Sequence, residues 1–340
     1  MPPDHEPTAD GQHAGAGTGP VACVLLEKDL TLRLGSRELA APEAGQALVR
    51  VEWAGVCGSD LHVLRTGAWV SRWPATLGHE VAGIVESCPG GEVAPGTPVV
   101  VDSRMPCRTC DGCAEAPNLC YRLAWVGEAC PGGFASHLVV PASGLVACPP
   151  GLELSVAVLA EPLAVAMHAV GKLPRPPTRV LLLGYGPVGA LLHLEITRRW
   201  PQATVAVSEP DAGRRQLASA LGAGAAAAAD GRWPVVIDAA GYRGSLADAV
   251  SAAANGGMVL AVALGHDVAE IRPARIVESE LTVAGSIGFD AELPDAVAVL
   301  AADPGRWRPL ITEAVLLEEA AGRLRQLTAA PAAGKVVIRP

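Results

Sequence analysis

The stretch RVLLLGYGPVGALLHLEITRRW, residues 179–200, decides the fold of this 340-residue chain. Its apolar run Val180–Leu183 has the pattern of a buried strand, and a glycine-rich turn and a helical segment follow it. In that setting glycines permit a tight turn, close approach of the backbone to a pyrophosphate, and close packing of the helix on the strand. The motif G-x-G-x-x-G therefore predicts a dinucleotide-binding turn formed by Gly184, Gly186, Pro187, Val188 and Gly189.

An acidic residue ends the next predicted strand, residues 204–209. Glu209 follows Gly189 by 20 residues, where a carboxylate accepts hydrogen bonds from the adenine ribose and repels a 2′-phosphate. We therefore expect NAD as the cofactor. NADP stays open, because Arg214 and Arg215 are close enough in sequence to help bind a 2′-phosphate if the loop bends.

Strands and helices continue to alternate after this turn. The patterns predict helices at 214–223 and 245–254, and strands at 235–241, 258–264 and near 281–287. A helical stretch at 155–170, interrupted by Pro162, precedes the turn. Such alternation is typical of an α/β fold with a doubly wound parallel sheet, the Rossmann architecture, here expected over residues 156–290.

The first part of the chain has a different pattern. Short β-prone runs bounded by turn residues predict a mostly β domain up to about residue 150, with strands at 21–26, 47–53, 81–86, 98–102 and 134–140. Residues 1–20 carry neither the basic nor the apolar region of a signal peptide, so we expect a disordered tail there. Residues 291–340 begin with a predicted helix near 291–302 and end in the strand-like GKVVIRP.

Composition excludes several classes of function. The net charge is −9, only 4% of residues are aromatic, and no cluster of Lys and Arg exists, so neither nucleic acid nor an anionic membrane is an expected partner. No apolar run is long enough to predict a transmembrane helix. Nine cysteines, an odd number, without a secretion signal favour metal ligation in a reducing, cytoplasmic compartment.

Four of these cysteines are crowded together as C-x2-C-x2-C-x6-C. Cys107, Cys110, Cys113 and Cys120 match the needs of a closed, tetrahedral zinc site that organises a loop. Reduced, unliganded thiols are disfavoured because the intervening residues make a polar loop. An iron–sulfur cluster stays possible on the number of ligands alone.

A second, open metal site is also predicted. Cys57, His79 and Glu161 offer the three protein ligands of a zinc that keeps one exchangeable position. Two other zinc motifs do not fit: a nucleobase deaminase needs one residue between His and Glu, whereas His79 and Glu80 are adjacent, and a zincin needs a second His where Gly83 stands.

Five motifs stand in the order found in zinc-dependent medium-chain dehydrogenases/reductases: CGSDLH (57–62), GHE (78–80), the cysteine quartet, AEP (160–162) and GYGPVG (184–189). Over residues 21–340 the chain resembles the branch of sorbitol, threonine and cyclitol dehydrogenases, which carry Glu rather than Cys as the third catalytic ligand. The resemblance implies a GroES-like catalytic domain from 21–155 and 291–340, with a structural zinc lobe at about 105–122. The last cysteine gap is one residue shorter than the family's usual x7.

The resemblance also implies roles for individual residues. Cys57, His79 and Glu161 would bind the catalytic zinc, and the quartet would bind a structural zinc, giving two zinc ions per chain. Glu80 would orient the site or exchange with zinc-bound water, and Ser286 would lie near the nicotinamide. Zinc would lower the pKa of the substrate hydroxyl, Ser59 would pass its proton through the nicotinamide ribose to His62, and a hydride would move to the cofactor. Family position also suggests pocket residues, namely Arg65, Trp69, Trp125 and Phe289.

The expected activity is zinc-dependent hydride transfer between NAD and a secondary alcohol of a small polyol, cyclitol or amino-sugar-like molecule, in a homodimer or homotetramer. One alternative is a dehydrogenase or reductase of a simple alcohol or aldehyde that uses NADP. Another is a non-catalytic, nucleotide-binding member of the fold. The two sets of ligands argue against a zinc-independent enone or quinone reductase.

Overall fold

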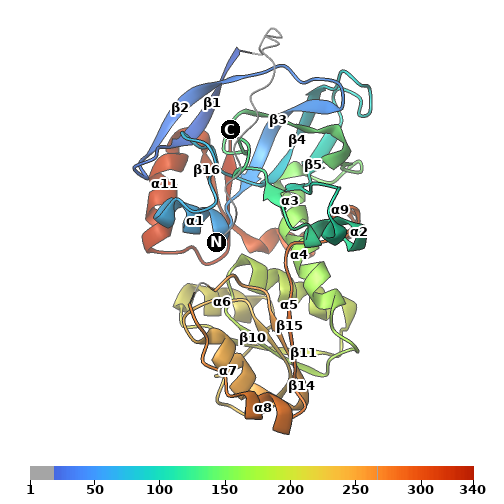
Figure 1. Cartoon of the computed structure of the whole chain (residues 1–340), viewed down its shortest axis with the longest axis vertical. Helices are drawn as coiled ribbons and strands as arrows, with labels where there is room; N and C mark the ends of the chain where they lie inside the picture. The colour runs from blue at the N-terminus through green and yellow to red at the C-terminus, as the bar shows by residue number, and fades with distance from the viewer. Residues whose placement is uncertain (1–18, 266) are drawn as a thin grey trace.

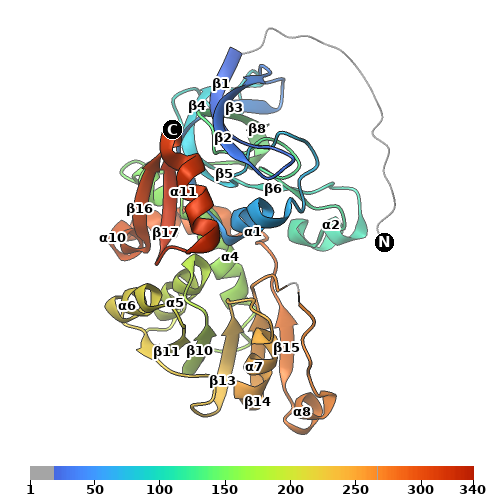
Figure 2. The same ribbon diagram turned by 90° about the vertical axis from the view of Figure 1, so that its left-hand side faces the viewer.

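The computed structural model describes residues 19–265 and 267–340, which form two lobes stacked along the long axis of the molecule (Figure 1). Residues 1–18, which make up most of the expected N-terminal tail, lie outside the described part, and the first strand begins at Gly19. In Figure 2 the C-terminal helix and strands lie beside the N-terminal strands in the same lobe, so both ends of the described chain build it.

The other lobe contains a six-stranded, wholly parallel sheet in the order β12-β11-β10-β13-β14-β15. This strand order confirms the prediction of a doubly wound parallel sheet. The strands are β10 (Arg179–Leu183), β11 (Thr204–Ser208), β12 (Gly224–Ala225), β13 (Trp233–Asp238), β14 (Ala253–Ala261) and β15 (Thr282–Gly285). The helices that follow them along the chain are α5 (Pro187–Arg199), α6 (Ala212–Ala220), α7 (Ser245–Ala252) and α8 (Pro273–Glu278).

Strand β10 shows why this sheet needs helices on both faces. Val180 and Leu182 pack in one apolar cluster with α5, whereas Leu181 and Leu183 pack in another with α7. Since successive side chains of a strand point to opposite faces, an unbroken apolar run is buried on both sides.

The mostly antiparallel sheet of the first lobe has the order β16-β17-β3-β4-β5-β9, and β8 also pairs with β3. Its strands are β3 (Gln46–Gly55), β4 (Glu80–Ser87), β5 (Pro98–Val101), β8 (His137–Pro141), β9 (Leu145–Ala147), β16 (Ile311–Leu316) and β17 (Lys335–Arg339). Two-stranded sheets are formed by β1 (Gly19–Leu26) with β2 (Leu32–Leu39) and by β6 (Arg104–Met105) with β7 (Ala124–Trp125). The helices of this part of the chain include α1 (Gly58–Thr66), α2 (Asp111–Glu115) and α11 (Leu317–Ala329), with the 3₁₀ turns η1 (Pro117–Leu119) and η2 (Ala142–Gly144). The short helix α10 (Pro304–Trp307) and the 3₁₀ turn η3 (Arg308–Leu310) precede β16.

The predicted helix at 155–170 is two helices, α3 (Leu154–Ala157) and α4 (Ala160–Gly171). The prediction that Pro162 interrupts it was wrong. The break falls at 158–159, and Pro162 lies in the first turn of α4, where a missing N–H breaks no intrahelical hydrogen bond.

Helix α4 lies at the junction of the two lobes, beside α9 (Leu293–Ala302), as Figure 1 shows. The segment that joins β15 to α9, residues 286–292, is called the crossover segment below. Side chains from outside the parallel-sheet lobe hold it: Asn118 Nδ2 donates to Ile287 O at 3.1 Å, and the Arg104 guanidinium lies 3.9 Å from the ring centre of Phe289. On α4, His168 Nδ1 lies 2.8 Å from Glu292 Oε1.

Within the described residues, no helix has both the length and the apolar character needed to cross a membrane.

Candidate active site and cofactor groove

The start of α1 and the start of β4 bring three potential ligands together. Cys57 Sγ, a ring nitrogen of His79 and a carboxylate oxygen of Glu80 all lie within 4.8 Å of one another. His79 and Glu80 are buried, and Cys57 is half-buried at the N-cap of α1. The structure therefore brings together the two expected ligands Cys57 and His79, with Glu80 as the third member of the group.

Asp60, a residue missed by the sequence analysis, fixes the geometry of this group. Its Oδ2 accepts a hydrogen bond from Cys57 N at 2.9 Å, and its Oδ1 accepts one from Gly78 N at 3.3 Å. The same Oδ1 lies 3.6 Å from His79 Nδ1. Burial disfavours the imidazolium, but Asp60 and Cys57 outweigh it and raise the pKa of His79 well above its usual value. A carboxylate that orients a histidine through Nδ1 is typical of metal sites.

Glu80 is held by Lys335, which the sequence analysis also missed. Lys335 Nζ lies 2.6 and 2.7 Å from the two Glu80 carboxylate oxygens and donates to Val56 O at 3.1 Å. Opposite Glu80 on β3, a Cβ on Gly55 would lie 2.0 Å from Glu80 Oε2, so only glycine leaves room for this carboxylate. A lysine just before the apolar run 336–338 was the one available sequence signal.

Glu161 lies in the first turn of α4, buried and outside the 4.8 Å group. Its Oε1 accepts a hydrogen bond from Ser103 Oγ at 2.8 Å. Burial raises the pKa of Glu161 to about 7, and both His79 and Glu80 act on it electrostatically, so its carboxylate is near this group. Thiolate, imidazole and carboxylate are the donors that suit zinc, and the residues present fit such an ion.

The two predicted relay residues, Ser59 and His62, lie three residues apart on α1 and therefore share a face of that helix. The His62 ring centre is 4.6 Å from that of Trp69, whose side chain is exposed. Trp125 is half-buried and Arg65 is exposed. Phe289 is fully buried, and the Arg104 guanidinium stacks on its ring.

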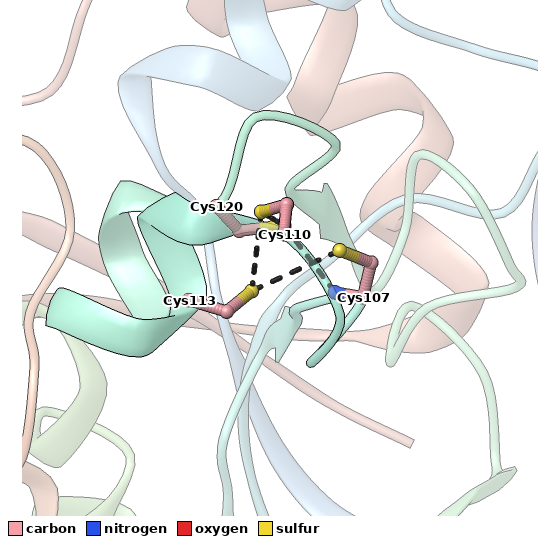
Figure 3. Close-up of side chains that lie close together, drawn as sticks. All are labelled: Cys107, Cys110, Cys113 and Cys120. Atoms are coloured by element: carbon pink, nitrogen blue, oxygen red, sulfur yellow. Dashed lines mark hydrogen bonds between the residues drawn. The ribbon is translucent and has the colours of Figure 1, made fainter.

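The cysteine quartet closes into a compact cluster around α2 and η1 (Figure 3). The sulfur–sulfur distances are 3.8 Å between Cys107 and Cys113, 3.6 Å between Cys110 and Cys113, and 3.9 Å between Cys110 and Cys120. A zinc ion with four bonds of about 2.3 Å requires sulfur atoms about 3.8 Å apart, so the quartet fits zinc despite its shortened last gap. Hydrogen bonds from Thr109 and then Arg122 lower the pKa of Cys107 to about 5, which favours the thiolate.

The glycine-rich turn has the geometry that the motif predicts. Gly184 has a φ of 88°, and a Cβ there would lie 2.9 Å from Ala240 Cβ. A Cβ on Gly189 would lie 2.4 Å from Gly184 O, so the helix packs directly on the turn. At Gly186, the N-cap of α5, the nearest atom would be 3.8 Å away, which leaves the backbone accessible. Pro187 and Val188 begin α5, and their helix end faces the accessible turn.

A groove of about 870 Å³ runs past this turn and includes Gly184, Gly186, Glu209, Arg214 and Tyr242 in its lining. Glu209 accepts hydrogen bonds from Tyr185 N at 2.7 Å and Asp211 N at 2.9 Å. Its Oε2 lies 3.9 Å from Arg214 Nη1. Arg215 Nη1 donates to Glu209 O at 3.0 Å. Ser286 directly follows β15, half-buried, and its backbone N–H donates to Ala261 O at 2.9 Å.

Comparison with known proteins identifies the family. A model of the alcohol dehydrogenase GroES-like domain matches residues 43–150. D-altritol 5-dehydrogenase of Agrobacterium fabrum is 32% identical over 292 residues, which are 81% of this chain and 86% of that protein. The chain belongs to the zinc-dependent medium-chain alcohol dehydrogenases.

Solved structures of the alcohol dehydrogenase family agree over nearly the whole chain. A short chain alcohol dehydrogenase of E. coli CFT073 complexed with NADH has a TM-score of 0.86 and 26% identity, with 95% of this chain and 100% of that chain covered. A protein described as a zinc-binding dehydrogenase of Sinorhizobium meliloti 1021, bound to NADP, has a TM-score of 0.83 and 30% identity over the same shares. The chain is accordingly an oxidoreductase that acts on CH–OH donors, with a GroES-like domain and a Rossmann-type parallel sheet.

Proposed function

We propose that the enzyme oxidises, reversibly, a secondary alcohol of a polyol, a cyclitol or an amino-sugar-like substrate with NAD. The observation that carries this proposal is the group of half-buried Cys57 with buried His79 and Glu80, whose ligand atoms lie within 4.8 Å of one another. D-altritol 5-dehydrogenase, the relative described above, acts by its name on a sugar alcohol, which supports this substrate class.

The chain's own residues have separable tasks in this proposal. Cys57, His79 and Glu161 would hold the catalytic zinc, which when bound acts as a Lewis acid on the substrate hydroxyl. Asp60 fixes Cys57 and His79 through its two oxygens. Ser59 would accept the hydroxyl proton, and His62, one turn further along α1, would release it to solvent.

The proposal of NAD rests on Glu209. Its carboxylate lines the groove while its two oxygens accept hydrogen bonds from Tyr185 N and Asp211 N, so it is fixed in place. A 2′-phosphate beside it would meet a negative charge. Of the two arginines that could favour NADP, Arg215 donates to the backbone carbonyls of Glu209 and Pro210. Arg214 Nη1 lies 3.9 Å from the Glu209 carboxylate, which offsets its charge.

The proposal includes a second zinc in the cysteine quartet, a homo-oligomeric assembly and a cytoplasmic location. None of the nine cysteines forms a disulfide, and zinc thiolates persist in compartments where disulfides do not form.

The test is a panel of polyols, cyclitols, amino alcohols and simple secondary alcohols, assayed with NAD and NADP by the formation of reduced cofactor. We expect NAD-dependent turnover of a polyol-type substrate, loss of that turnover in Cys57→Ser, and unchanged NAD affinity in the same variant. Cys88→Ser, a change of the cysteine that directly follows β4, is the control and should retain activity. Turnover that survives Cys57→Ser would exclude the catalytic zinc, and turnover confined to simple alcohols with NADP would exclude the proposed substrate class.

A further inference from the structure

One carboxylate beside the active site has no task in the mechanism above. Glu128 lies in the turn that runs from Trp125 to Cys130, where Glu128 N donates to Trp125 O at 3.2 Å and Gly127 N donates to Cys130 O at 2.9 Å. Glu128 O accepts a hydrogen bond from Ser71 N at 3.3 Å. The backbone around Glu128 is therefore fixed by the protein itself.

This turn packs directly against the segment that carries His79. A Cβ on Gly127 would lie 3.1 Å from Gly78 N and 3.3 Å from the carbonyl carbon of Leu77. Val126 N donates to Ser103 O at 2.8 Å, and Ser103 also donates to Glu161. The turn that carries Glu128 therefore contacts two parts of the active site. One is the segment that carries His79, and the other is Ser103, which donates to Glu161.

The side chain of Glu128 is half-buried, yet in residues 19–265 and 267–340 its carboxylate has neither a hydrogen bond nor an ion pair. The charged groups that act on it are His79 and Asp60, both in the active site. Burial raises the pKa of Glu128 to about 7, His79 lowers it and Asp60 raises it. No arginine or lysine among the described residues offsets its charge there.

We propose that Glu128 is a specificity-determining residue that accepts hydrogen bonds from the end of the substrate remote from the reacting carbon. This inference rests on the proposed function, whose substrate class it narrows. The preferred end group is an ammonium, as in an amino alcohol or amino sugar; a hydroxyl comes next, and a carboxylate is rejected.

Electrostatics set this order. A half-buried carboxylate that lacks a partner gains most from a cation, because a charge-assisted hydrogen bond is about twice as strong as a neutral one. A hydroxyl donates a weaker hydrogen bond to the same oxygen. A sugar acid would place a second negative charge beside Glu128 and Asp60, and like charges that share one site disfavour ionisation of both.

The test uses three probes that differ at one end only: glucamine (1-amino-1-deoxysorbitol), sorbitol and gluconate. Each is assayed with NAD and the zinc-loaded full chain at about pH 8, where the amine is protonated and the carboxylates are ionised. We expect kcat/KM to fall in the order glucamine, sorbitol, gluconate. Glu128→Gln should lower the ratio of kcat/KM for glucamine to that for sorbitol at least tenfold, mainly by raising KM for glucamine. The same variant should raise kcat/KM for gluconate.

Two further variants complete the design. Glu128→Asp retains the charge and should retain the order of the three probes. Glu319→Gln removes an exposed carboxylate from α11 and should change none of the ratios. Calorimetric titration of each probe into the enzyme–NADH complex measures the same preference without turnover.

The outcomes separate the two proposals. If glucamine and sorbitol bind in the expected order without being oxidised, the role of Glu128 stands and the proposed activity fails. If the probes are oxidised and Glu128→Gln changes kcat/KM for all three by the same factor, the proposed activity stands and the proposed role of Glu128 is wrong. If none of the probes binds, the role of Glu128 is likewise wrong.

Discussion

Lys335 Nζ and the Glu80 carboxylate are joined by contacts of 2.6 and 2.7 Å in a place where both side chains are buried. The two residues are 255 positions apart in the sequence, and their pairing attaches β17, near the C-terminus, to the first residue of β4 beside His79. The active-site carboxylate is therefore held by the last strand of the chain.

Removing one partner of this pair leaves a buried charge without compensation. We expect Lys335→Met to lower the free energy of unfolding by about 3–5 kcal/mol, measured by urea denaturation of the zinc-loaded enzyme. The double variant Lys335→Met, Glu80→Gln should lose clearly less than the sum of the two single changes, because no charge then remains unpaired. A single-variant loss below about 1 kcal/mol would show that water reaches the pair.

The cysteine quartet predicts a metal content that can be measured directly. We expect elemental mass spectrometry of the purified chain to find two zinc ions, and Cys113→Ser to retain one, because three ligands hold a structural zinc poorly. The control Cys148→Ser, in which the changed thiol lies far from both groups along the chain, should keep both. A Cys113→Ser chain that still holds two zinc ions would mean that Cys113 is not needed to bind the second ion, and the proposed four-sulfur site would be wrong.

Glu209 should determine the choice of cofactor. Glu209→Gln removes the negative charge that would meet a 2′-phosphate, and Arg214 Nη1, 3.9 Å from Glu209 Oε2, is then free to attract it. We expect the ratio of kcat/KM for NADP to that for NAD to rise at least tenfold. The variant also loses one acceptor for the N–H groups of Tyr185 and Asp211, so its NAD affinity should fall somewhat.

Asp230 provides the matched control for this change. It lines the same groove but is exposed, and its Oδ2 accepts a hydrogen bond from Ala227 N at 2.6 Å instead of supporting the glycine-rich turn. Asp230→Asn should leave the cofactor ratio nearly unchanged. An equal shift in both variants would point to the general charge of the groove and not to Glu209.

His193 should make the free energy of unfolding depend on pH. Burial, with help from Arg306, lowers the pKa of His193 to about 4, and the imidazole lies 2.8 Å from the Tyr185 hydroxyl. Because the unfolded chain binds this proton near pH 6.5 and the folded chain only near pH 4, stability present above about pH 6.5 is lost as the pH falls toward 4. The loss from this group is on the order of 3 kcal/mol.

We expect His193→Asn to reduce that loss, since its amide does not titrate while its oxygen can still accept from Tyr185. The measurement is the urea midpoint of the variant and the unchanged chain at about pH 7.5 and about pH 5. Equal acid sensitivity in the two chains would assign the effect to other groups.

The sequence predicted the local motifs and the pairing of Cys57 with His79, and it missed the residues that hold these ligands in place. The glycine-rich turn and the cysteine quartet each lie within one short segment, where spacing alone constrains geometry. Asp60 was missed although it stands between Ser59 and His62, because its hydrogen bonds go to Cys57 and to Gly78 in another segment. Lys335 and Glu128 act across the fold, which no single-sequence pattern records.

Helix α11 was not predicted, although its sequence contains a helical pattern. Leu317, Ala320, Leu324 and Leu327 are buried at helical spacing, so the periodicity was present in the sequence. Strand β2 has no such signal: its residues alternate irregularly between polar and apolar, and its pairing with β1 fixes its conformation. Tertiary contacts decide such segments, since strand propensity depends on neighbouring strands.

The contacts of Asn118 give the cysteine quartet a mechanical consequence. Asn118 lies between Cys113 and Cys120, its amide reaches both Ile287 O and, at 3.2 Å, His168 Nε2, and His168 in turn contacts Glu292. Both ends of the crossover segment are thereby tied to a loop whose shape the four sulfurs define. A shift of the crossover segment relative to this loop would break these contacts, so the segment that joins the parallel-sheet lobe to α9 takes its position from the loop that carries the four sulfurs.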